Sequence, residues 1–297
     1  MGQGPRRPPG ERARRRARPR RHGPLQAPRR RRPVSDAEKP PVSRGRRALV
    51  AAGAAAAIIA VWNAPGVVRR FLPQRFDFEP VETPPGFRRL ARGDASRVVD
   101  PFIGIGGGEG PAAPDIDPAS LVADLCRALF RFEQVESGVV PVASFSDYFC
   151  PHCRVLTRRL AAIAETDPSV RVAWHEWPLF GRMSEVAARA ALAARRQGAY
   201  PAFQAALSRG GFLPTPEFIR SLAERIDVDP DRLVADMDDP GIDREIAEST
   251  ALARLFRFPG TPGLVVGRTL VDGALDDAAL AALIARERAD GPVPGCA

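Results

Sequence analysis

The chain has 297 residues and a formal net charge of +9 at pH 7. The charge is unevenly distributed, because residues 1–47 hold 17 Arg and Lys against three acidic residues, a net +14, which leaves −5 for the other 250 residues. A mildly acidic globular part has no electrostatic basis for binding nucleic acid, so we expect no such partner. The Arg-rich stretches of residues 1–47 could bind nucleic acid or anionic lipid, but we favour a solvated segment that fixes membrane topology. The four cysteines are too few for a small fold stapled by disulfides, but they suffice for one redox pair and two further thiols.

Residues 1–47 are rich in Arg, Pro and Gly and hold almost no apolar residues. Such a segment cannot bury enough surface to offset the entropy lost on ordering, so we expect a disordered tail. The next 21 residues, 48–68, are uncharged and have two Arg on either side. A helix of this length reaches about 31 Å and can cross a bilayer. The positive charge before it predicts a transmembrane signal anchor with a cytoplasmic N-terminus, and a cleaved signal peptide or a twin-arginine signal is the alternative.

Residues 69–116 are rich in Pro and Gly, which predicts a linker. The glycine-rich stretch 103–108 has the composition of a phosphate-binding loop. However, no strand precedes it, and Pro-rich sequence follows where such a loop has a helix, so we do not expect phosphate binding there. The phenylalanines of this segment are candidates for packing against the domain that follows.

A globular domain is expected over residues 117–292, with a first helix at 121–132. Residues 139–145 form an apolar run typical of a buried strand, and the residues after them have the apolar spacing of an amphipathic helix. A second strand at 170–177 completes a β-α-β unit, whose strands we expect to be parallel and joined by a right-handed crossover.

The second half of the domain begins with a predicted helical insertion at about 184–256. A β-hairpin with a tight turn at Gly267 follows, and a last helix begins near Asp276. The order β-α-β, helices, β-β-α predicts an α/β fold.

The motif Cys150-Pro151-His152-Cys153 stands where the first strand ends and the helix begins. A zinc site usually requires four ligands, and the chain has no second Cys pair of this spacing, so we favour a redox pair and expect no metal. A helix N-terminus favours a thiolate, and His152 can place a donor or partial positive charge near the Cys150 sulfur. We expect Cys150 to face outward at the sheet edge with a lowered pKa, and Cys153 to be the more buried, resolving thiol.

The turn Gly260-Thr261-Pro262-Gly263 stands between a helix end and a strand. Its Thr-Pro bond is a candidate for a cis peptide, and local chemistry leaves the cis and trans forms equally open. A cis turn beside the active thiol would offer backbone groups with which a client peptide pairs as an added strand.

Three motifs together resemble the DsbA-type thiol-disulfide oxidoreductases, in particular their membrane-anchored or exported thioredoxin-like branch. They are FSDYFCPHC at 145–153, WPLFG at 177–181 and Gly-Thr-Pro at 260–262. The resemblance covers about residues 139–290. It implies a thioredoxin-like fold with a helical insertion, Cys150 as the attacking thiol and Cys153 as its partner. It also implies that Pro262 is a cis-proline preceded by Thr261, where substrate binds.

Two positions depart from the family pattern. Many members carry a buried Glu six residues before the first cysteine, where this chain has Ser144. Asp147 matches an acid common in the family, but it cannot be assumed to replace that Glu in proton transfer. Thr261 before the cis-proline occurs in several redox branches, so it does not fix the direction of electron flow.

The resemblance implies an enzyme without a cofactor that oxidises cysteine pairs of exported proteins through a Cys150–Cys153 disulfide. The expected partners are reduced or unfolded exported proteins and a quinone-linked, DsbB-like membrane oxidase. We expect an inner-membrane location with the catalytic domain in the periplasm. The alternatives are a reductase or isomerase of the same fold and, less favoured, a Cu(I)-binding or holdase module. Of the remaining cysteines, Cys126 and Cys296 either form a structural disulfide or stay free thiols.

Overall fold

The structure is a computed structural model that describes residues 75–91, 114–132 and 135–296. The predicted tail at 1–47, the predicted signal anchor at 48–68 and the glycine-rich stretch of the linker lie outside these residues. Within the described ranges, none of the helices combines the length and the apolar character that crossing a membrane requires.

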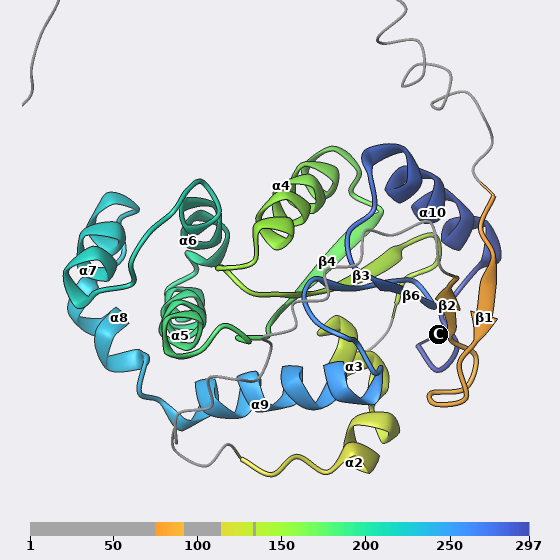
Figure 1. The fold of residues 1–297 in the computed structure, drawn as a ribbon, viewed down its shortest axis with the longest axis horizontal. Helices are drawn as coiled ribbons and strands as arrows, with labels where there is room; N and C mark the ends of the chain where they lie inside the picture. Colours follow the sequence, from red (N-terminus) through yellow and green to blue (C-terminus); the bar gives the residue numbers. More distant parts are fainter. Residues whose placement is uncertain (1–74, 92–113, 133–134, 297) are drawn as a thin grey trace, which may run out of the picture. The chain divides into compact units, whose positions relative to one another are not determined.

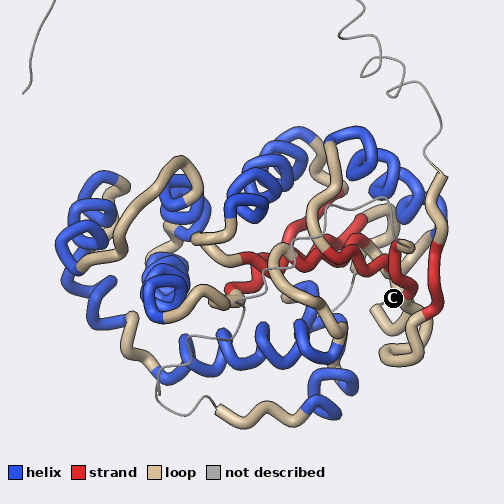
Figure 2. Tube along the Cα trace, viewed as in Figure 1, coloured by secondary structure: helices blue, strands red, loops and turns tan. Residues whose placement is uncertain are grey.

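A six-stranded mixed sheet forms the centre of the domain, with the strand order β1-β2-β6-β5-β3-β4 (Figures 1 and 2). The predicted β-α-β unit is confirmed, because β3 and β4 pair in parallel over seven residues. The predicted hairpin is confirmed as well, since β5 pairs antiparallel with both β3 and β6. The strands are β1 (Phe78–Pro80), β2 (Arg88–Leu90), β3 (Val140–Ser146), β4 (Val170–Glu176), β5 (Gly263–Val266) and β6 (Thr269–Asp272).

Helices cover both faces of this sheet (Figure 1). The helices α4 and α10 pack on one face, and α3 and α9 pack on the other. The predicted helical insertion is confirmed as α5 to α9, whereas the predicted helix at 121–132 is two short helices that meet at Asp124. The helices are α2 (Pro118–Ala123), α3 (Leu125–Phe130), α4 (Pro151–Thr166), α5 (Arg182–Arg196), α6 (Tyr200–Leu207), α7 (Pro216–Arg225), α8 (Pro230–Asp236), α9 (Pro240–Leu255) and α10 (Asp277–Asp290).

Strand β3 is buried on both faces, which explains its nearly continuous apolar sequence. Because side chains alternate along a strand, Val140 and Val142 join the core beneath α4 and α10. Ala143 and Phe145 join the opposite core beneath α3 and α9. The strand thus fixes the start of α4, and with it the cysteine motif, at the end of a rigid element.

Residues 75–91 differ from the predicted linker, because they add two strands to the sheet. Strand β1 pairs with β2, and β2 pairs in parallel with β6. Phe87 and Leu90 are buried in the two cores on either side of the sheet. The Thr83–Pro84 peptide between the strands is cis. Proline and glycine in this segment shape a turn, and strands of three residues are too short to show an alternating pattern.

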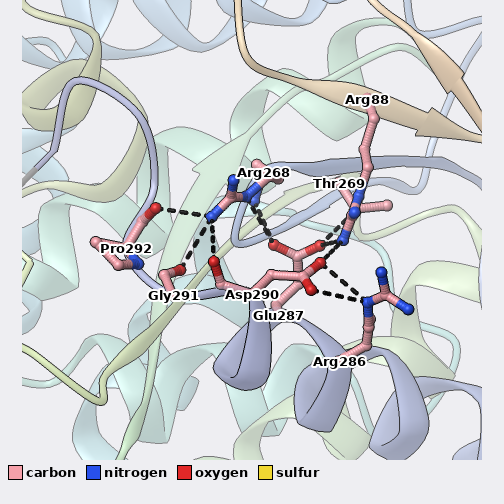
Figure 3. Close-up of polar contacts among 8 residues, drawn as sticks. All are labelled: Arg88, Arg268, Thr269, Arg286, Glu287, Asp290, Gly291 and Pro292. Atoms are coloured by element: carbon pink, nitrogen blue, oxygen red, sulfur yellow. Dashed lines mark hydrogen bonds and ion pairs between the residues drawn. The ribbon is translucent and has the colours of Figure 1, made fainter.

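A buried ion cluster holds this hairpin to the end of the domain (Figure 3). Arg88 of β2 donates to Thr269 (2.8 Å), to Asp290 (2.6 Å) and to Glu287 of α10. Glu287 also accepts from the backbone N–H of Arg268 at 2.9 Å. Because the side chain of Glu287 is only 1% exposed, these pairings satisfy a charge that would otherwise be costly to bury.

Cys126 of α3 and Cys296 form a disulfide, with their Cα atoms 5.1 Å apart. Of the two states left open by the sequence, the structure therefore shows the bonded one. The bond joins residues separated by 170 positions and lies in the core beneath α3 and α9.

Candidate active site

Cys150 is the N-cap residue of α4 and has extended backbone angles, with φ −81° and ψ 115°. Pro151 follows at the first helical position, where its fixed φ suits a helix and its missing N–H is not needed. The Cys150 sulfur accepts a hydrogen bond from the backbone N–H of Cys153 at 3.3 Å. The sequence therefore places one thiol at the end of the helix that presents free N–H groups, and the other one turn into it.

The pKa values of the two thiols are shifted in opposite directions, although both thiols are buried. The pKa of Cys150 is lowered to about 7, chiefly by its hydrogen bond with the Cys153 side chain and further by backbone N–H groups, while burial opposes the shift. The pKa of Cys153 is raised well above its ordinary value by burial and by the neighbouring Cys150 sulfur. Deprotonation of the reduced pair therefore falls on Cys150.

Cys150 does not face outward, because its residue surface is only 1% exposed. The cover comes from the loop before β5, where the carbonyl of Thr261 accepts a hydrogen bond from the Cys150 sulfur at 3.5 Å. The expectation of an outward sulfur was wrong because strand direction alone says nothing about a loop folded over the strand's end. The His152 side chain is exposed, and His152 acts on Cys150 through its backbone.

The Thr261–Pro262 peptide is cis, as the resemblance implied. The carbonyl of Pro262 accepts from the N–H of Gly273 at 3.0 Å, which fixes the turn at the start of β5. Gly263 follows, and a Cβ there would stand 2.7 Å from the ring of Phe258, so only glycine fits. This packing holds the Thr261 carbonyl against the Cys150 sulfur.

Asp147 is a buried hydrogen-bond acceptor that joins the cysteine loop to the segment before α5. Its Oδ1 accepts from the N–H of Phe149 at 2.7 Å and from the hydroxyl of Ser184 at 2.8 Å. Its Oδ2 accepts from the N–H groups of Leu179 at 2.6 Å and Phe180 at 3.2 Å. Burial raises the pKa of Asp147 despite these four bonds. The role that this geometry supports is positioning of the loop that carries Cys150.

Comparison with known proteins agrees with this geometry. Residues 141–285 match the DSBA-like thioredoxin domain family. A thioredoxin-like oxidoreductase from Silicibacter pomeroyi DSS-3 is 36% identical, and the match covers 55% of this chain and 97% of that one with a TM-score of 0.51. The chain belongs to the DsbA-like thioredoxin family.

Two further proteins are similar to this chain. The thiol-disulfide exchange protein alpha-DsbA2 from Wolbachia pipientis is 25% identical over 58% of this chain and 94% of that one, with a TM-score of 0.48. The Na(+)/H(+) antiporter NhaA 3 of Salinispora tropica is 29% identical over 147 residues. These residues are 49% of this chain and only 22% of the antiporter's length. The DsbA-like domain identifies the chain as a thiol-disulfide oxidoreductase, and such proteins act on cysteine-containing substrates.

A buried carboxyl group in this DsbA-like domain was not identified from the sequence. Glu176 ends β4 and is 3% exposed. Its Oε1 accepts from the hydroxyls of Tyr148 at 2.8 Å and Tyr200 at 2.6 Å. Burial raises its pKa to about 7. Parallel pairing of β3 and β4 places Glu176 opposite Ser146, four residues before Cys150. This register would have indicated that Glu176 lies near the cysteines, but the composition of the chain does not reveal the register.

Ser144 is buried on β3, and its hydroxyl lies 3.2 Å from that of Ser146. A hydroxyl cannot exchange a proton near neutral pH as a carboxyl group can. Ser144 therefore cannot take the proton-transfer role of the Glu that many family members carry at this position. Among the described residues, no three or more His, Cys, Asp or Glu side chains are grouped in a way that would hold a metal ion.

Proposed function

We propose that this DsbA-like domain oxidises cysteine pairs of exported proteins. The observation that carries the proposal is the contrast between Cys150, with a pKa of about 7, and Cys153, with a pKa raised well above its ordinary value. A stabilised thiolate favours the reduced form of the pair, so the corresponding disulfide is a stronger oxidant.

In the proposed reaction a client thiolate attacks the Cys150 sulfur of the Cys150–Cys153 disulfide. A client–Cys150 bond forms, the Cys150–Cys153 bond breaks, and the electron pair and then a proton go to Cys153. A second client thiolate attacks the client sulfur of this mixed disulfide and releases Cys150 as a thiolate. The client leaves with a disulfide, and the enzyme has gained two electrons. The cis turn at Thr261 and Pro262 lies beside Cys150, where a client strand can pair with the backbone.

The location and the electron acceptor are part of the same proposal. Residues 48–68 anchor the chain in the inner membrane, the basic segment 1–47 stays in the cytoplasm, and the catalytic domain faces the periplasm. A quinone-linked, DsbB-like oxidase accepts the two electrons. The charge distribution of the sequence supports this orientation. Labelling of an introduced cysteine in residues 1–47 with a membrane-impermeant maleimide tests it: no labelling is expected in intact spheroplasts, and labelling there overturns it.

The reduction potential of the Cys150–Cys153 pair, measured in glutathione buffers, tests the direction. We expect a value above about −200 mV, towards the roughly −120 mV of strongly oxidising pairs. A value near or below about −270 mV would instead identify a reductase. In parallel, Cys150→Ser should abolish oxidation of a reduced two-cysteine peptide, and Cys153→Ser should accumulate the mixed disulfide. Full activity of Cys150→Ser would overturn the assignment of Cys150.

A further inference from the structure

The departing sulfur of the proposed reaction, Cys153, needs a proton inside the protein. Its residue is 1% exposed, and burial raises its pKa well above the ordinary value. A thiolate released at this place is therefore unstable until it is protonated. Bulk water does not reach it directly, so a group within the domain must supply the proton.

A small cavity lies beside Cys153. About 10 Å³ of it is open to the centre of a water molecule, which is roughly the space that one water needs. Carbon atoms make up most of its exposed lining, but each residue around it carries a polar group or a thiol, and Arg154 and Tyr148 are among them, so a water there can find hydrogen-bond partners. The lining includes Cys153, Ser146, Thr157, Glu176, Gln204 and Ser208.

We infer that Glu176 is the proton donor and acceptor for Cys153, acting through one water in this cavity. The inference rests on the proposed function. When a client thiolate breaks the Cys150–Cys153 bond, the water passes a proton to the Cys153 thiolate and receives one from the Glu176 carboxylic acid. Cys153 becomes a thiol and Glu176 a carboxylate. On reoxidation the proton returns along the same path as Cys153 attacks.

The surroundings of Glu176 suit this role. Tyr148 and Tyr200 both donate to Oε1, so Oε2 takes no part in these two bonds. The pKa of Glu176 is raised to about 7 by burial, against the lowering effect of both tyrosines and of the Arg195 charge, while the Glu245 charge raises it. A group with this pKa exchanges protons in both directions near neutral pH.

Asp147 also lines the cavity and is the competing candidate. Its two oxygens accept three backbone N–H groups and the hydroxyl of Ser184. These donors point at both oxygens of an ionised carboxylate. Protonation of Asp147 would place its O–H donor next to N–H or O–H donors, which is unfavourable. Asp147 is therefore a positioning residue, and the proton transfer falls to Glu176.

The test compares the full-length wild type with Glu176→Gln, starting from the Cys150–Cys153 disulfide. The rate of its reduction by dithiothreitol is measured from pH 6 to pH 8 by acid quenching, alkylation and mass spectrometry. Each rate is divided by the concentration of dithiothreitol thiolate. For wild type we expect a fall of about tenfold over this range, because a group with a pKa of about 7 goes from about nine-tenths to one-tenth protonated. For Glu176→Gln we expect a slower rate at pH 6 and a change of less than about twofold.

One variant serves as a control. Glu287→Gln removes another buried carboxyl group, on α10, and should keep the tenfold fall. A tenfold fall that persists in Glu176→Gln, or that disappears in Glu287→Gln, overturns the inference. A wild type that exchanges with thiols at no pH would overturn the proposed function itself, so the two failures are distinguishable.

Discussion

Replacement of Glu176 by Gln should make the domain more stable at alkaline pH. The pKa of Glu176 is about 7 in the folded protein against an ordinary value of 4.5, so the fold favours the protonated form. The contribution to stability is fully present below about pH 4.5 and is lost as the pH rises through about 7. This displacement of the pKa corresponds to roughly 3 kcal/mol, most of which is lost between pH 5 and pH 8.

Gln is a neutral replacement of the same shape, and its carbonyl oxygen can accept from the tyrosines that bind Oε1. Between pH 5 and pH 8 the free energy of unfolding of wild type should therefore fall by roughly 2 to 3 kcal/mol more than that of the variant. Urea unfolding at one-unit pH intervals measures this, with equal m-values as the condition for comparing the two proteins. A difference between variant and wild type that stays constant with pH would refute the reasoning.

Three further predictions concern the cysteines and the loop that carries Cys150. The rate of Cys150 alkylation by iodoacetamide should be half-maximal near pH 7, and Cys153→Ala should shift the midpoint upward, because the hydrogen bond that most lowers the pKa of Cys150 is lost. Asp147→Ala should lower the free energy of unfolding by about 3 to 5 kcal/mol, since three partly buried N–H groups and the buried Ser184 hydroxyl lose their acceptor. Removal of the Cys126–Cys296 disulfide by two Ala substitutions should lower it by about 2 to 5 kcal/mol.

Each of these has a result that would count against it. An alkylation midpoint near pH 9 in wild type would remove the basis for a stabilised thiolate at Cys150. For the loop, Asp277→Ala is a matched control, because the Asp277 side chain is 77% exposed and its loss should cost less than about 1 kcal/mol. An equally small effect of Asp147→Ala would show that its hydrogen bonds are replaced by water. For the disulfide, unchanged stability under reducing and oxidising conditions would contradict the prediction.

The order of elements was predictable from the sequence because local signals carry it. The apolar run of β3, the proline after Cys150 and the cysteine spacing each act within a few residues, so the strand-to-helix junction follows from them. The helical insertion and the β5–β6 hairpin follow in the same way. The cis form of Pro262 came from the resemblance, since the turn alone left both forms open.

The features that the sequence did not reveal depend on contacts between distant residues. From the sequence alone Arg88 is assigned to the linker, because its partners on α10 lie about 200 positions later in the chain. From the sequence alone Glu176 is an ordinary polar residue at a strand end. Its burial depends on two tyrosine donors that come from other segments of the chain. The burial of Cys150 requires the loop at Thr261, which lies 111 positions away, to fold over it. None of these pairings has a periodic pattern.

The Cys126–Cys296 disulfide also determines how the domain bears mechanical load. A pull applied between a residue before Cys126 and one after Cys296 passes through the sulfur–sulfur bond. The chain between them, a separation of 170 residues, carries no tension. Fully extended it would measure roughly 600 Å, and this length is released only when the bond is reduced. Cys150, Cys153 and the cis turn all lie on that unloaded loop, so the redox geometry is insulated from tension along the chain.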